Sequence, residues 1–580
     1  MIDSKEVIKL DKQTYNTLKS EDFRELEWHI LELLRSGVRR EEHLSFVVAI
    51  TAMALVSKET SDRTSMMNYL ENSIGDETTI TFLKKVEKEF NVQIKEISDK
   101  YEKDTLKAAT LFTESRRPYE ADNSTPEGIS ELAIALLNIN ENDVILDLGS
   151  GVNSFLIQAA FESGNRNLYG VEVNTSNVII ANIRRCIVGL PINTIQGNVI
   201  SQGLTYLSAN KVLSNHSLGV RLSELQKYAD KNPELKKYFK NAKRTVTADW
   251  VFNIAAFLNT KQPGRTVVLM TNAGTWNKAD ENIRKRLLEE GTVEGVIQLP
   301  ERLLSYTMAP LTMIVFSQNN KTVKMVDASK IYTEKRRQNE LEPTNVEKII
   351  KAYHEDTEIS KKVTIAELAE QEYILNPQRY IGPDIGIENG ILLGDLCLSI
   401  NRGAMISSDV LDELVTTDET NYHYLMLQNI SEGAIDPSLP NLIKIENKYQ
   451  KHCINNKNLI ISKISPFKVA MAHVKENESI VANGNLYFIE LDENKVNPIF
   501  VQVFLLSETG MAQLNRLAKG SLVKNISIQD LKKIQIPDLP RVEQDRIAVE
   551  YENLSDELTI LQKQMDIVRD KKANILEGVI

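Results

Sequence analysis

The sequence predicts an α/β protein in three parts: a helical N-terminal region, a parallel sheet covered by helices, and a mixed α/β region that ends in a long helix. Apolar residues recur at helical spacing before residue 115, and apolar strands alternate with helical segments from 116 to 330. Short strands with glycine- and proline-rich turns follow from about 387. A chain of 580 residues has room for three or four such domains.

The N-terminal region, residues 1–115, carries apolar periodicity and little else. Apolar residues recur at helical steps from Leu26 to Leu34, fill most of 44–55, and recur again from Phe82 to Ile97. No catalytic constellation is visible here, including the carboxylates and lysine of a nuclease. We expect a helical domain that packs against the rest of the chain or docks a partner.

The middle region, residues 116–330, alternates strands with helical segments, which implies a parallel sheet. Residues 331–386 are charged and rich in helix formers, so we expect a helical connector there. The expected strands are Val144–Leu146, Leu168–Val171, Lys211–Ser214, Thr266–Thr271, Val293–Gln298 and Met313–Ser317.

Composition narrows the class of protein. No apolar run approaches the roughly 20 residues of a membrane-spanning helix, and no secretory signal is visible, so we expect a cytoplasmic protein without a membrane contact. Cys186, Cys397 and Cys453 lie far apart, which argues against a zinc site or a disulfide framework, and no metal is expected. A net charge of -11 opposes non-specific nucleic-acid binding but permits local basic clusters.

A glycine turn follows the first expected strand of the middle region. Asp147 ends the strand, Gly149 and Gly151 form the turn, and Phe155 opens a helix. Glycine lets the backbone approach a ligand closely, and Asp147 can accept hydrogen bonds. Glu172 ends the next strand about twenty residues later, where a carboxylate can bind ribose hydroxyls. The pattern favours a nucleotide-type ligand, although the G-x-G-x-x-G spacing of dinucleotide sites is incomplete and a glycine turn without a ligand is the alternative.

These segments resemble the modification subunit of type I restriction-modification systems, a group of N6-adenine DNA methyltransferases that use S-adenosylmethionine. The family's Asp-Pro-Ala-Cys-Gly-Thr-Gly-Gly-Phe-Leu corresponds to the residues from Asp147 to Leu156, with Asn153-Ser154 in place of Gly-Gly. Residues 263–269, 296–300 and 310–316 match further family segments in the same order. The resemblance covers over 200 residues and implies a Rossmann-like, S-adenosylmethionine-dependent methyltransferase domain.

The resemblance implies a cofactor site. Thr125-Pro126 matches the segment that lies against the methionine part of the cofactor, and Glu172 matches the ribose-binding acid. Asn198 stands where the family usually has an Asp facing the adenine. The expected cofactor-binding residues are Thr125, Pro126, Asp147, Gly149, Gly151, Glu172 and Asn198.

The catalytic loop departs from the family. Asn215-His216-Ser217-Leu218 stands where the family has Asn-Pro-Pro-Phe or Asn-Pro-Pro-Tyr. In the family, the Asn side chain and the first proline carbonyl bind the target adenine N6, and the aromatic ring stacks on a base flipped out of the duplex. Here Asn215 remains and the His216 carbonyl can replace that of proline. The stiffness of the prolines is lost, as is most of the stacking on an aromatic ring, which is worth about 1–3 kcal/mol.

We therefore expect Asn215, His216 and Leu218 to occupy the catalytic positions and methyl transfer to be impaired. The chain would then bind DNA and S-adenosylmethionine as a recognition platform for a partner nuclease or ATPase subunit, and a working N6-adenine DNA methyltransferase is the alternative. His216 could also act as a general base, although no partner carboxylate is visible. Tyr306 and Trp276 are candidates for a substitute aromatic.

Residues 387–540 resemble a single target-recognition domain of a type I specificity subunit, which reads half of a bipartite site in double-stranded DNA. The resemblance rests on residues 393–395, 400–403, 458–463 and 536–540. Cationic side chains there could neutralise phosphates or read bases, although solvated surface charge is the alternative for any one of them. The candidates are Arg402, Lys463, Lys468, Arg516, Lys519 and Lys524.

The last segment, residues 541–580, predicts a coiled-coil helix. Its apolar residues alternate at steps of four and three, which is the a/d pattern of paired helices. One recognition domain per chain then suggests a homodimer that reads a symmetric, split site. A helix that packs only on its own domain is the alternative. The seam comprises Ile547, Tyr551, Leu554, Leu558, Leu561, Met565, Val568 and Ile575, interrupted by Lys572.

Overall fold

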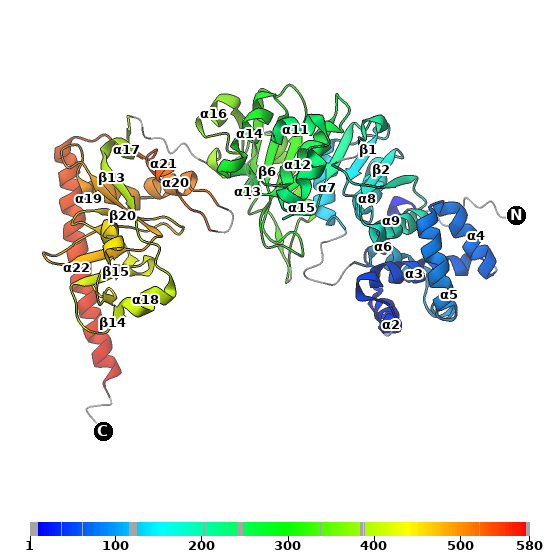
Figure 1. Ribbon diagram of the computed structural model, residues 1–580, viewed down its shortest axis with the longest axis horizontal. Helices are drawn as coiled ribbons and strands as arrows, with labels where there is room; N and C mark the ends of the chain where they lie inside the picture. The colour runs from blue at the N-terminus through cyan, green and yellow to red at the C-terminus, as the bar shows by residue number, and fades with distance from the viewer. Residues whose placement is uncertain are drawn as a thin grey trace. The chain divides into compact units, whose positions relative to one another are not determined.

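The structure is a computed structural model that divides into two compact units, Met1–Gly382 and Pro383–Ile580 (Figure 1). The residues that the structure describes are 10–35, 37–60, 62–114, 124–200, 203–239, 247–336, 338–382, 387, 389–520 and 523–575.

The described part of the first unit begins with six helices, the third of which is buried among the others. They are α1 (Lys12–Leu18), α2 (Arg24–Leu34), α3 (His43–Glu59), α4 (Arg63–Ile74), α5 (Glu77–Lys100) and α6 (Lys103–Phe112). Every side chain of α3 from Ser45 to Val56 is buried. Beside its neighbours α5 and α6, α3 packs on α9 (Thr175–Val188) of the sheet region.

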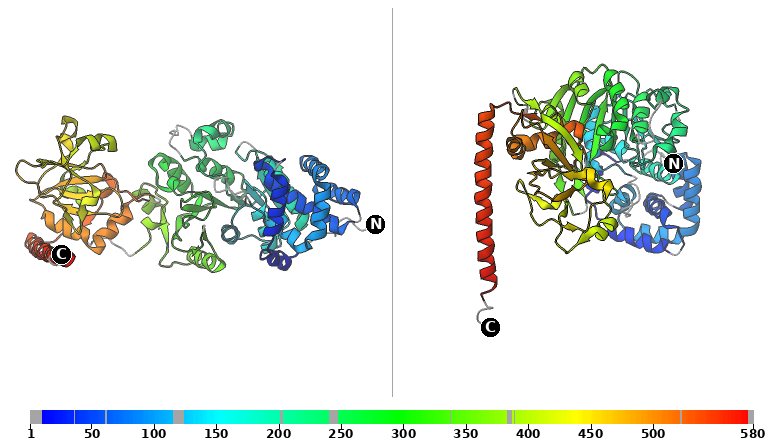
Figure 2. Two further views of the ribbon diagram at one scale, coloured as in Figure 1. Left: turned by 90° about the horizontal axis from the view of Figure 1, so that it is seen from below. Right: turned by 60° about the vertical axis from the view of Figure 1, so that its left-hand side comes forward.

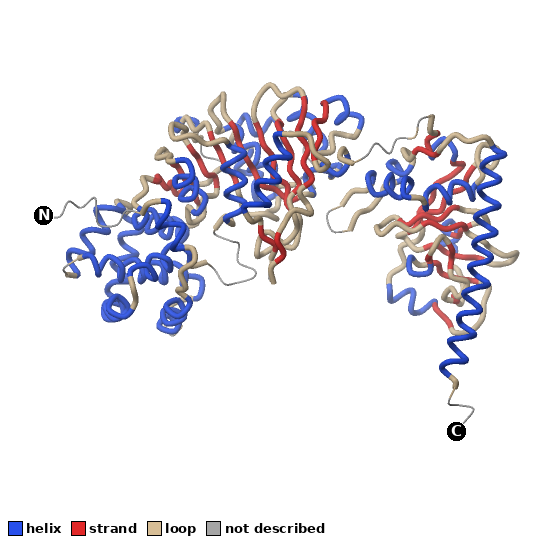
Figure 3. Tube along the Cα trace, turned by 180° about the vertical axis from the view of Figure 1, so that it is seen from behind, coloured by secondary structure: helices blue, strands red, loops and turns tan. Residues whose placement is uncertain are grey.

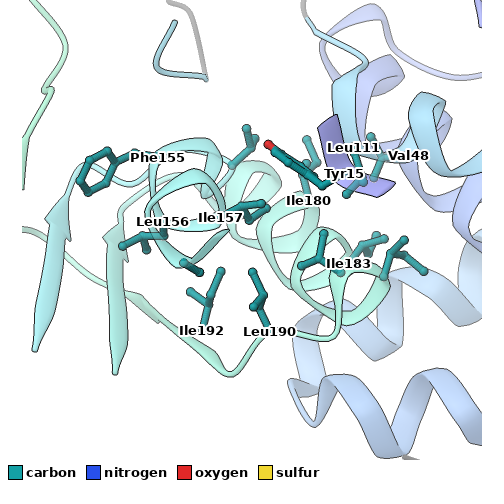
Figure 4. Packing of buried hydrophobic residues seen from close by; sticks show 14 of the residues in the cluster. Tyr15, Val48, Leu111, Phe155, Leu156, Ile157, Ile180, Ile183, Leu190 and Ile192 are labelled. Atoms are coloured by element: carbon teal, nitrogen blue, oxygen red, sulfur yellow. The ribbon is translucent and has the colours of Figure 1, made fainter. Parts of the chain in front are cut away.

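The N-terminal helices share a hydrophobic core with the sheet region. Tyr15 and Val48 belong to the same buried cluster as Ile180 and Ile183 of α9 (Figure 4). The Arg184 guanidinium also donates hydrogen bonds to the carbonyl oxygens of Thr110 and Thr113, at 3.1 and 2.6 Å. The helices therefore form part of the first unit and support the sheet from outside.

Nine strands form the central sheet of the first unit, in the order β11-β8-β6-β7-β5-β4-β1-β2-β3. The strands from β3 to β5 pair in parallel. The bounds are β1 (Ile145–Leu148), β2 (Leu168–Glu172), β3 (Ile192–Gln196), β4 (Lys211–Ser214), β5 (Arg265–Thr271), β6 (Val293–Gln298), β7 (Leu311–Phe316), β8 (Thr322–Asp327) and β11 (Ser360–Thr364).

The sheet departs from the expected all-parallel arrangement at β7 and β11. β7 runs antiparallel to both β5 and β6, and β11 runs antiparallel to β8. A parallel connection usually contains a crossover helix, whereas residues 299–310 between β6 and β7 form bends and turns. Direct return of the chain therefore reverses the direction of β7. The strands β3, β8 and β11 were not among the six expected.

Helices cover both faces of the sheet, and strand residues alternate between two cores. Ile145 belongs to one core, while Leu146 and Leu148 belong to the other. On the first face lie α7 (Glu127–Leu137), α8 (Ser154–Ser163), α9 and α15 (Pro343–His354). The second core includes residues of α10 (Leu222–Ala229), α11 (Pro233–Phe239), α12 (Asp249–Leu258), α14 (Glu281–Glu289) and α16 (Ile365–Glu370).

Residues 331–382 are built into the first unit instead of forming a free connector. They contribute β11 to the edge of the sheet and α15, which packs on α7. A short hairpin, β9 (Thr333–Glu334) with β10 (Asn339–Glu340), precedes α15. The short elements α13 (Ala273–Trp276), η1 (Arg40–Glu42), η2 (Thr205–Leu207), η3 (Lys278–Asp280) and η4 (Pro377–Arg379) complete the unit.

The second unit contains two main sheets, visible in Figure 3 as short strands among long loops. One sheet has the order β13-β23-β20-β21 and the other β14-β18-β15-β22-β19. The strands are β12 (Ile391–Leu392), β13 (Cys397–Arg402), β14 (Val415–Thr416), β15 (Tyr422–Leu425), β16 (Ile430–Ser431), β17 (Ala434–Ile435), β18 (Asn441–Leu442), β19 (Cys453–Ile454), β20 (Leu459–Ser462), β21 (Val469–Met471), β22 (Ser479–Ala482), β23 (Leu486–Leu491) and β24 (Gln535–Ile536).

The helices of the second unit end in one long helix. They are α17 (Leu393–Leu396), α18 (Ser408–Leu414), η5 (Leu427–Asn429), η6 (Asn447–His452), α19 (Pro498–Leu506), α20 (Glu508–Leu517), α21 (Ile528–Leu531) and α22 (Arg541–Ala573). The first turns of α22 are fastened to α19, because Asn497 binds the side chains of Gln544 and Asp545 at 2.8 Å each. The rest of α22 extends beyond the globular part of its unit (Figure 2).

Among the described residues, no single helix is long and apolar enough to cross a bilayer, and Arg40–Glu59 with Arg63–Ile74 meet those limits only as a pair bent by 116°.

Candidate functional site

A cavity of about 380 Å³ opens at the carboxyl ends of β1 to β4. Ligands of open parallel sheets bind at this edge, and the volume falls within the range of small-molecule pockets. The described residues that line it come from the segments after these four strands, from Ser124-Thr125, from α9, α10 and α12, and from the segment between β6 and β7.

The glycine turn and Glu172 form one end of the cavity. Gly149 and Gly151 have φ of 87° and 52°, which L side chains rarely adopt. The Gly151 N–H donates to Glu172 Oε2 at 3.0 Å, and the Asn174 N–H donates to Glu172 Oε1 at 2.7 Å. Each carboxylate oxygen keeps a further lone pair for a ligand. The carboxylate is thereby fixed in place on the cavity wall.

Asn153 explains how the turn tolerates the loss of the family's Gly-Gly pair. It adopts φ of 64°, in the left-handed region, where Asn is better tolerated than most residues. Its side-chain amide donates to Thr194 Oγ1 at 2.9 Å, and the neighbouring Ser154 hydroxyl accepts from the Thr125 N–H at 2.9 Å. The substitution thus keeps the backbone path and ties it to β3 and to Thr125.

Asp147 lies beneath the turn and is not among the described residues of the cavity wall. Its side chain is 1% exposed, and its Oδ1 has no hydrogen-bond partner within the described chain. Burial, followed by repulsion from Glu172, raises the pKa of Asp147 to about 8. Pro126 also lies off the wall, whereas Thr125, Gly149, Gly151, Glu172 and Asn198 line it.

Amides and hydroxyls supply most of the polar groups of the described wall. Asn174, Asn177, Asn198 and Asn215 line the cavity with Glu172, and its described wall contains no Lys or Arg. Amides donate and accept hydrogen bonds, and a lone carboxylate favours a ligand with positive charge. The wall therefore suits a polar ligand that carries a cation. No three His, Cys, Asp or Glu side chains of the described chain gather as a metal site requires.

The Asn215–Ser217 segment lines the cavity beside the glycine turn. Asn215 Nδ2 donates to Thr125 Oγ1 at 3.1 Å, and Asn215 Oδ1 is buried without a partner among the described residues. The backbone passes close to the glycine turn, since a Cβ on Gly149 would lie 3.5 Å from the Asn215 carbonyl oxygen. Asn215 therefore has an unused acceptor in the cavity region.

The two other expected catalytic residues behave differently. His216 lines the cavity but is buried, with its ring stacked on Phe252 at 4.4 Å and its Nε2 3.5 Å from Asp249 Oδ1. Leu218 does not line the described wall, because its side chain packs against the core of the first sheet face. Position 218 thus contributes to packing here.

An aromatic ring reaches the cavity from another segment. Tyr306, between β6 and β7, lines the wall together with Leu304, whereas Trp276 lies off the described wall. Phe252 of α12 adds a second ring. Asp249 and Phe252 were missed from the sequence because they lie in an apolar helix and look like ordinary core residues. Only aligned relatives could have distinguished them.

In the second unit, neighbouring loops bring several candidate cations together. Arg402 Nε donates to the Gly484 carbonyl oxygen at 2.8 Å, and the Lys463 N–H donates to the Asn485 carbonyl oxygen at 2.7 Å. The pKa of Lys463 is lowered by partial burial and then by the nearby Arg402. Two positive charges thus lie close together beside the loop 483–485.

The remaining candidate DNA-binding cations differ in the contacts that they make within the unit. Lys519 forms an ion pair at 3.1 Å with Asp530, whose side chain is fully buried, and Lys468 Nζ donates to the Leu427 carbonyl oxygen at 3.0 Å. The Lys524 backbone carbonyl accepts from the Ser465 N–H, which places Lys524 beside the Lys463 segment. Arg516 lies in the last turn of α20.

The apolar seam of α22 is exposed over most of its length. Ile547 packs against the core of its unit and Tyr551 is half-buried, but the members from Leu554 onward are exposed. Ile560 and Ile567 widen this stripe, and both are exposed. The exposed seam residues are Leu554, Leu558, Leu561, Met565, Val568 and Ile575, each between 46 and 66% exposed.

Two family models match the chain in succession. Residues 112–386 match "N-6 DNA Methylase", and residues 391–567 match "Type I restriction modification DNA specificity domain". Among curated proteins, the MjaVIII methylase subunit of a type I restriction enzyme from Methanocaldococcus jannaschii is 27% identical over 49% of this chain and 53% of its own length. The MjaVII methylase subunit from the same organism is 24% identical over 64% of this chain and 68% of its own length.

The matched part of the chain thus spans about half the length of the first of these relatives and about two thirds of the second. Among solved structures, a type I methyltransferase subunit from Streptococcus thermophilus is 19% identical, with a TM-score of 0.49 over 63% of this chain and 99% of that one.

Proposed function

Because this chain belongs to the N6-adenine DNA methyltransferase family and continues into a type I specificity domain, we propose that it binds S-adenosylmethionine and double-stranded DNA and transfers the methyl group slowly. Binding and chemistry are assigned to different parts of the cavity. The glycine-turn end would hold the cofactor, and the end at residues 215–217 would receive a flipped adenine.

The glycine-turn end fits S-adenosylmethionine, the cofactor of this family. Glu172, held by two backbone N–H groups, can accept hydrogen bonds from ribose hydroxyls. The amides of Asn198 and Asn177 can pair with a nitrogen heterocycle, and the absence of Lys and Arg from the described wall leaves a sulfonium without repulsion. When bound, the cofactor supplies an electrophilic methyl group.

Slow chemistry follows from one observation: Leu218 is half-buried against the core of the first sheet face and lies off the described cavity wall. The family places at this position the aromatic ring on which the flipped base stacks. Methyl transfer depends on in-line positioning of the acceptor, so an acceptor that stacks poorly reacts slowly. Asn215, with its free Oδ1, can still accept a hydrogen bond from the adenine amino group.

A second candidate is an efficient methyltransferase, and Tyr306 favours it. The Tyr306 ring lines the cavity that Asn215 also lines, and a ring from another segment can stack on a base as well as one from the loop itself. In that case the aromatic has been relocated along the chain and not lost.

The second unit would read the DNA. Arg402 and Lys463 form a pair of nearby cations that an anionic phosphate would stabilise. The exposed seam of α22 supports a homodimer, in which two specificity domains read a split site. A partner nuclease or ATPase subunit would then act on the DNA that this dimer holds.

Two substitutions separate slow from efficient methylation. If the ring is missing, wild-type transfer to genomic DNA is slow and Leu218→Phe accelerates it about tenfold, which corresponds to half or more of a base–aromatic stack. If Tyr306 supplies the ring, wild-type transfer is fast and Tyr306→Leu slows it by a similar factor. Radioactive methyl incorporation gives the rates, and calorimetric titration with S-adenosylmethionine shows whether each variant still binds the cofactor.

Both candidate functions require that the protein binds S-adenosylmethionine. A wild-type protein that binds no S-adenosylmethionine at millimolar concentration contradicts both candidates. Slow wild-type transfer that Leu218→Phe leaves unchanged contradicts the explanation from position 218.

A further inference from the structure

The side chain of His216, the residue after Asn215, is buried and contacts two side chains of α12. Its side chain is 2% exposed, and its imidazole lies on the Phe252 ring with 15° between the two planes. Its Nε2 lies 3.5 Å from Asp249 Oδ1. Phe252 and Asp249 are three residues apart on α12, so both contacts come from one face of one helix.

Asp249 is itself fixed by the end of β5. Its Oδ2 accepts hydrogen bonds from the Thr271 N–H at 2.8 Å and from the Thr271 hydroxyl at 2.7 Å. Burial raises the pKa of Asp249, but the contacts with His216 and Thr271 outweigh burial and hold that pKa below its ordinary value. The carboxylate is therefore ionised, and it links the His216 ring to both α12 and β5.

The two contacts of the His216 ring, with Phe252 and Asp249, form a clamp. This clamp acts on the loop that carries Asn215. His216 follows Asn215 directly, and a Cβ on Gly149 would lie 3.7 Å from the His216 Cα. A ring fixed on α12 therefore restricts the backbone at His216, whose own carbonyl stands where the family uses the first proline carbonyl to bind adenine. Prolines restrict a loop through φ, whereas here a buried ring would restrict it through packing.

We propose that His216 is a positioning residue: clamped by Phe252 and Asp249, it replaces the rigidity of the absent prolines and holds Asn215 toward the acceptor. This inference rests on the proposed function, because it assigns to His216 the rigidity that methyl transfer requires of the loop at 215–218. It also argues against His216 as a general base, since both ring nitrogens are buried and Nε2 faces Asp249.

Three variants of the full-length chain separate the contributions. His216→Ala removes both contacts, His216→Phe keeps an aromatic ring on Phe252 without the contact to Asp249, and Asp249→Asn removes the carboxylate charge at constant size. Phe161→Leu is the matched control, because Phe161 stacks on Tyr15 at 4.5 Å in the first unit and lies off the described cavity wall. Hydrogen exchange of the amides in 213–219 reports on the loop in every variant.

In His216→Ala we expect loop exchange to accelerate about tenfold or more, as local opening becomes easier, and kcat to fall by about tenfold to a hundredfold, as misplacement of reacting groups predicts. The dissociation constant for S-adenosylmethionine should change little, which separates positioning from collapse of the cavity. His216→Phe should recover part of the protection, and Phe161→Leu should change neither loop exchange nor kcat.

Unchanged loop exchange in both His216→Ala and Asp249→Asn would refute the clamp. Faster exchange with unchanged kcat would refute the positioning role. If the wild-type protein transfers no methyl group, the catalytic part of the proposed function fails, while the exchange measurements still decide whether the clamp exists. If His216→Ala does not fold, the size-matched Asp249→Asn and the ring-preserving His216→Phe carry the same comparison.

Discussion

The cavity of the first unit and the basic loops of the second unit are built in different ways. In the cavity, backbone geometry makes the site: the glycine turn fixes the path, and two N–H groups hold Glu172. In the second unit, side chains from separate loops make the surface, and some of its cations already have partners, as Lys519 does in Asp530. The sequence therefore locates a site where a motif determines the backbone conformation. It does not show whether a given Lys or Arg is available to bind DNA or is already paired within the protein.

The same contrast holds for apolar residues. Nearly all of α3 is buried between helices of the first unit, and the seam of α22 in the second unit is exposed. An exposed apolar stripe of this length is costly in water unless another surface covers it.

The largest effect is expected from the end of α22. Deleting residues 556–580 should convert a dimer into a monomer, because most of the exposed seam is removed while Gln544, Asp545 and Tyr551 remain on their own unit. Light scattering coupled to gel filtration should show the mass per particle falling by about half, the all-or-none result expected of paired helices.

A matched pair of full-length variants controls for the truncation. Leu558→Glu with Leu561→Glu places charges in the seam, and Gln562→Glu with Gln564→Glu places the same charges beside it. The first pair should give monomers and the second should leave the dimer intact. A wild-type chain that is already monomeric at micromolar concentration would leave the seam without this role.

Asp147 should give the ligand-free first unit an unusual dependence on pH. Its folded pKa of about 8 exceeds the ordinary value of 3.8, so the folded protein retains a proton that the unfolded chain releases. Its contribution is therefore fully present below about pH 4 and is lost as the pH rises toward 8. Asp147→Asn should remove this loss, and at pH 8 the variant should be more stable, on the order of 5 kcal/mol, since each pKa unit corresponds to about 1.4 kcal/mol.

Urea unfolding of both proteins at several pH values measures the effect. Asp104→Asn, which changes an exposed carboxylate, is the control and should track the wild type. A difference between Asp147→Asn and the wild type that stays constant from pH 5 to pH 8 would show that Asp147 is ionised in the folded protein.

Much of the first unit could be predicted from the sequence because its signals are local. The glycine turn, the carboxylate that ends β2 and the six expected strands follow from neighbouring residues, and the structure places Gly149, Gly151 and Glu172 on one wall. The antiparallel β7 could not be read, because strand direction depends on the path of a connection that lacks a helix.

The part of the cavity around residues 215–218 could not be predicted, because the residues that form it are distant in the sequence. The loop at 215–218 looked loose once its prolines were gone, yet Asp249 and Phe252 hold His216 from an apolar helix more than thirty residues away. Leu218 was expected in the catalytic position, but it is half-buried against the core and lies off the described wall, while Tyr306 lines the cavity from beyond β6. Side-chain packing across the fold decides such positions.

The smallest effect concerns the cations of the second unit. A cation that already has an ion-pair partner within the unit should contribute less to DNA binding than one that has none. Arg402→Ala and Lys463→Ala should each weaken DNA binding and lower the slope of log affinity against log salt by about 1, since each removes a phosphate contact. Lys519→Ala should leave that slope unchanged and instead lower the stability of the unit by about 3–5 kcal/mol, because the buried Asp530 carboxylate would keep its bond from the Ser527 hydroxyl but lose the cation. Salt titrations of DNA binding by fluorescence anisotropy, with urea unfolding of the same proteins, measure both quantities. A salt slope that falls for Lys519→Ala but not for Lys463→Ala would reverse the assignment, and it would mean that an internal ion pair does not withhold a lysine from DNA.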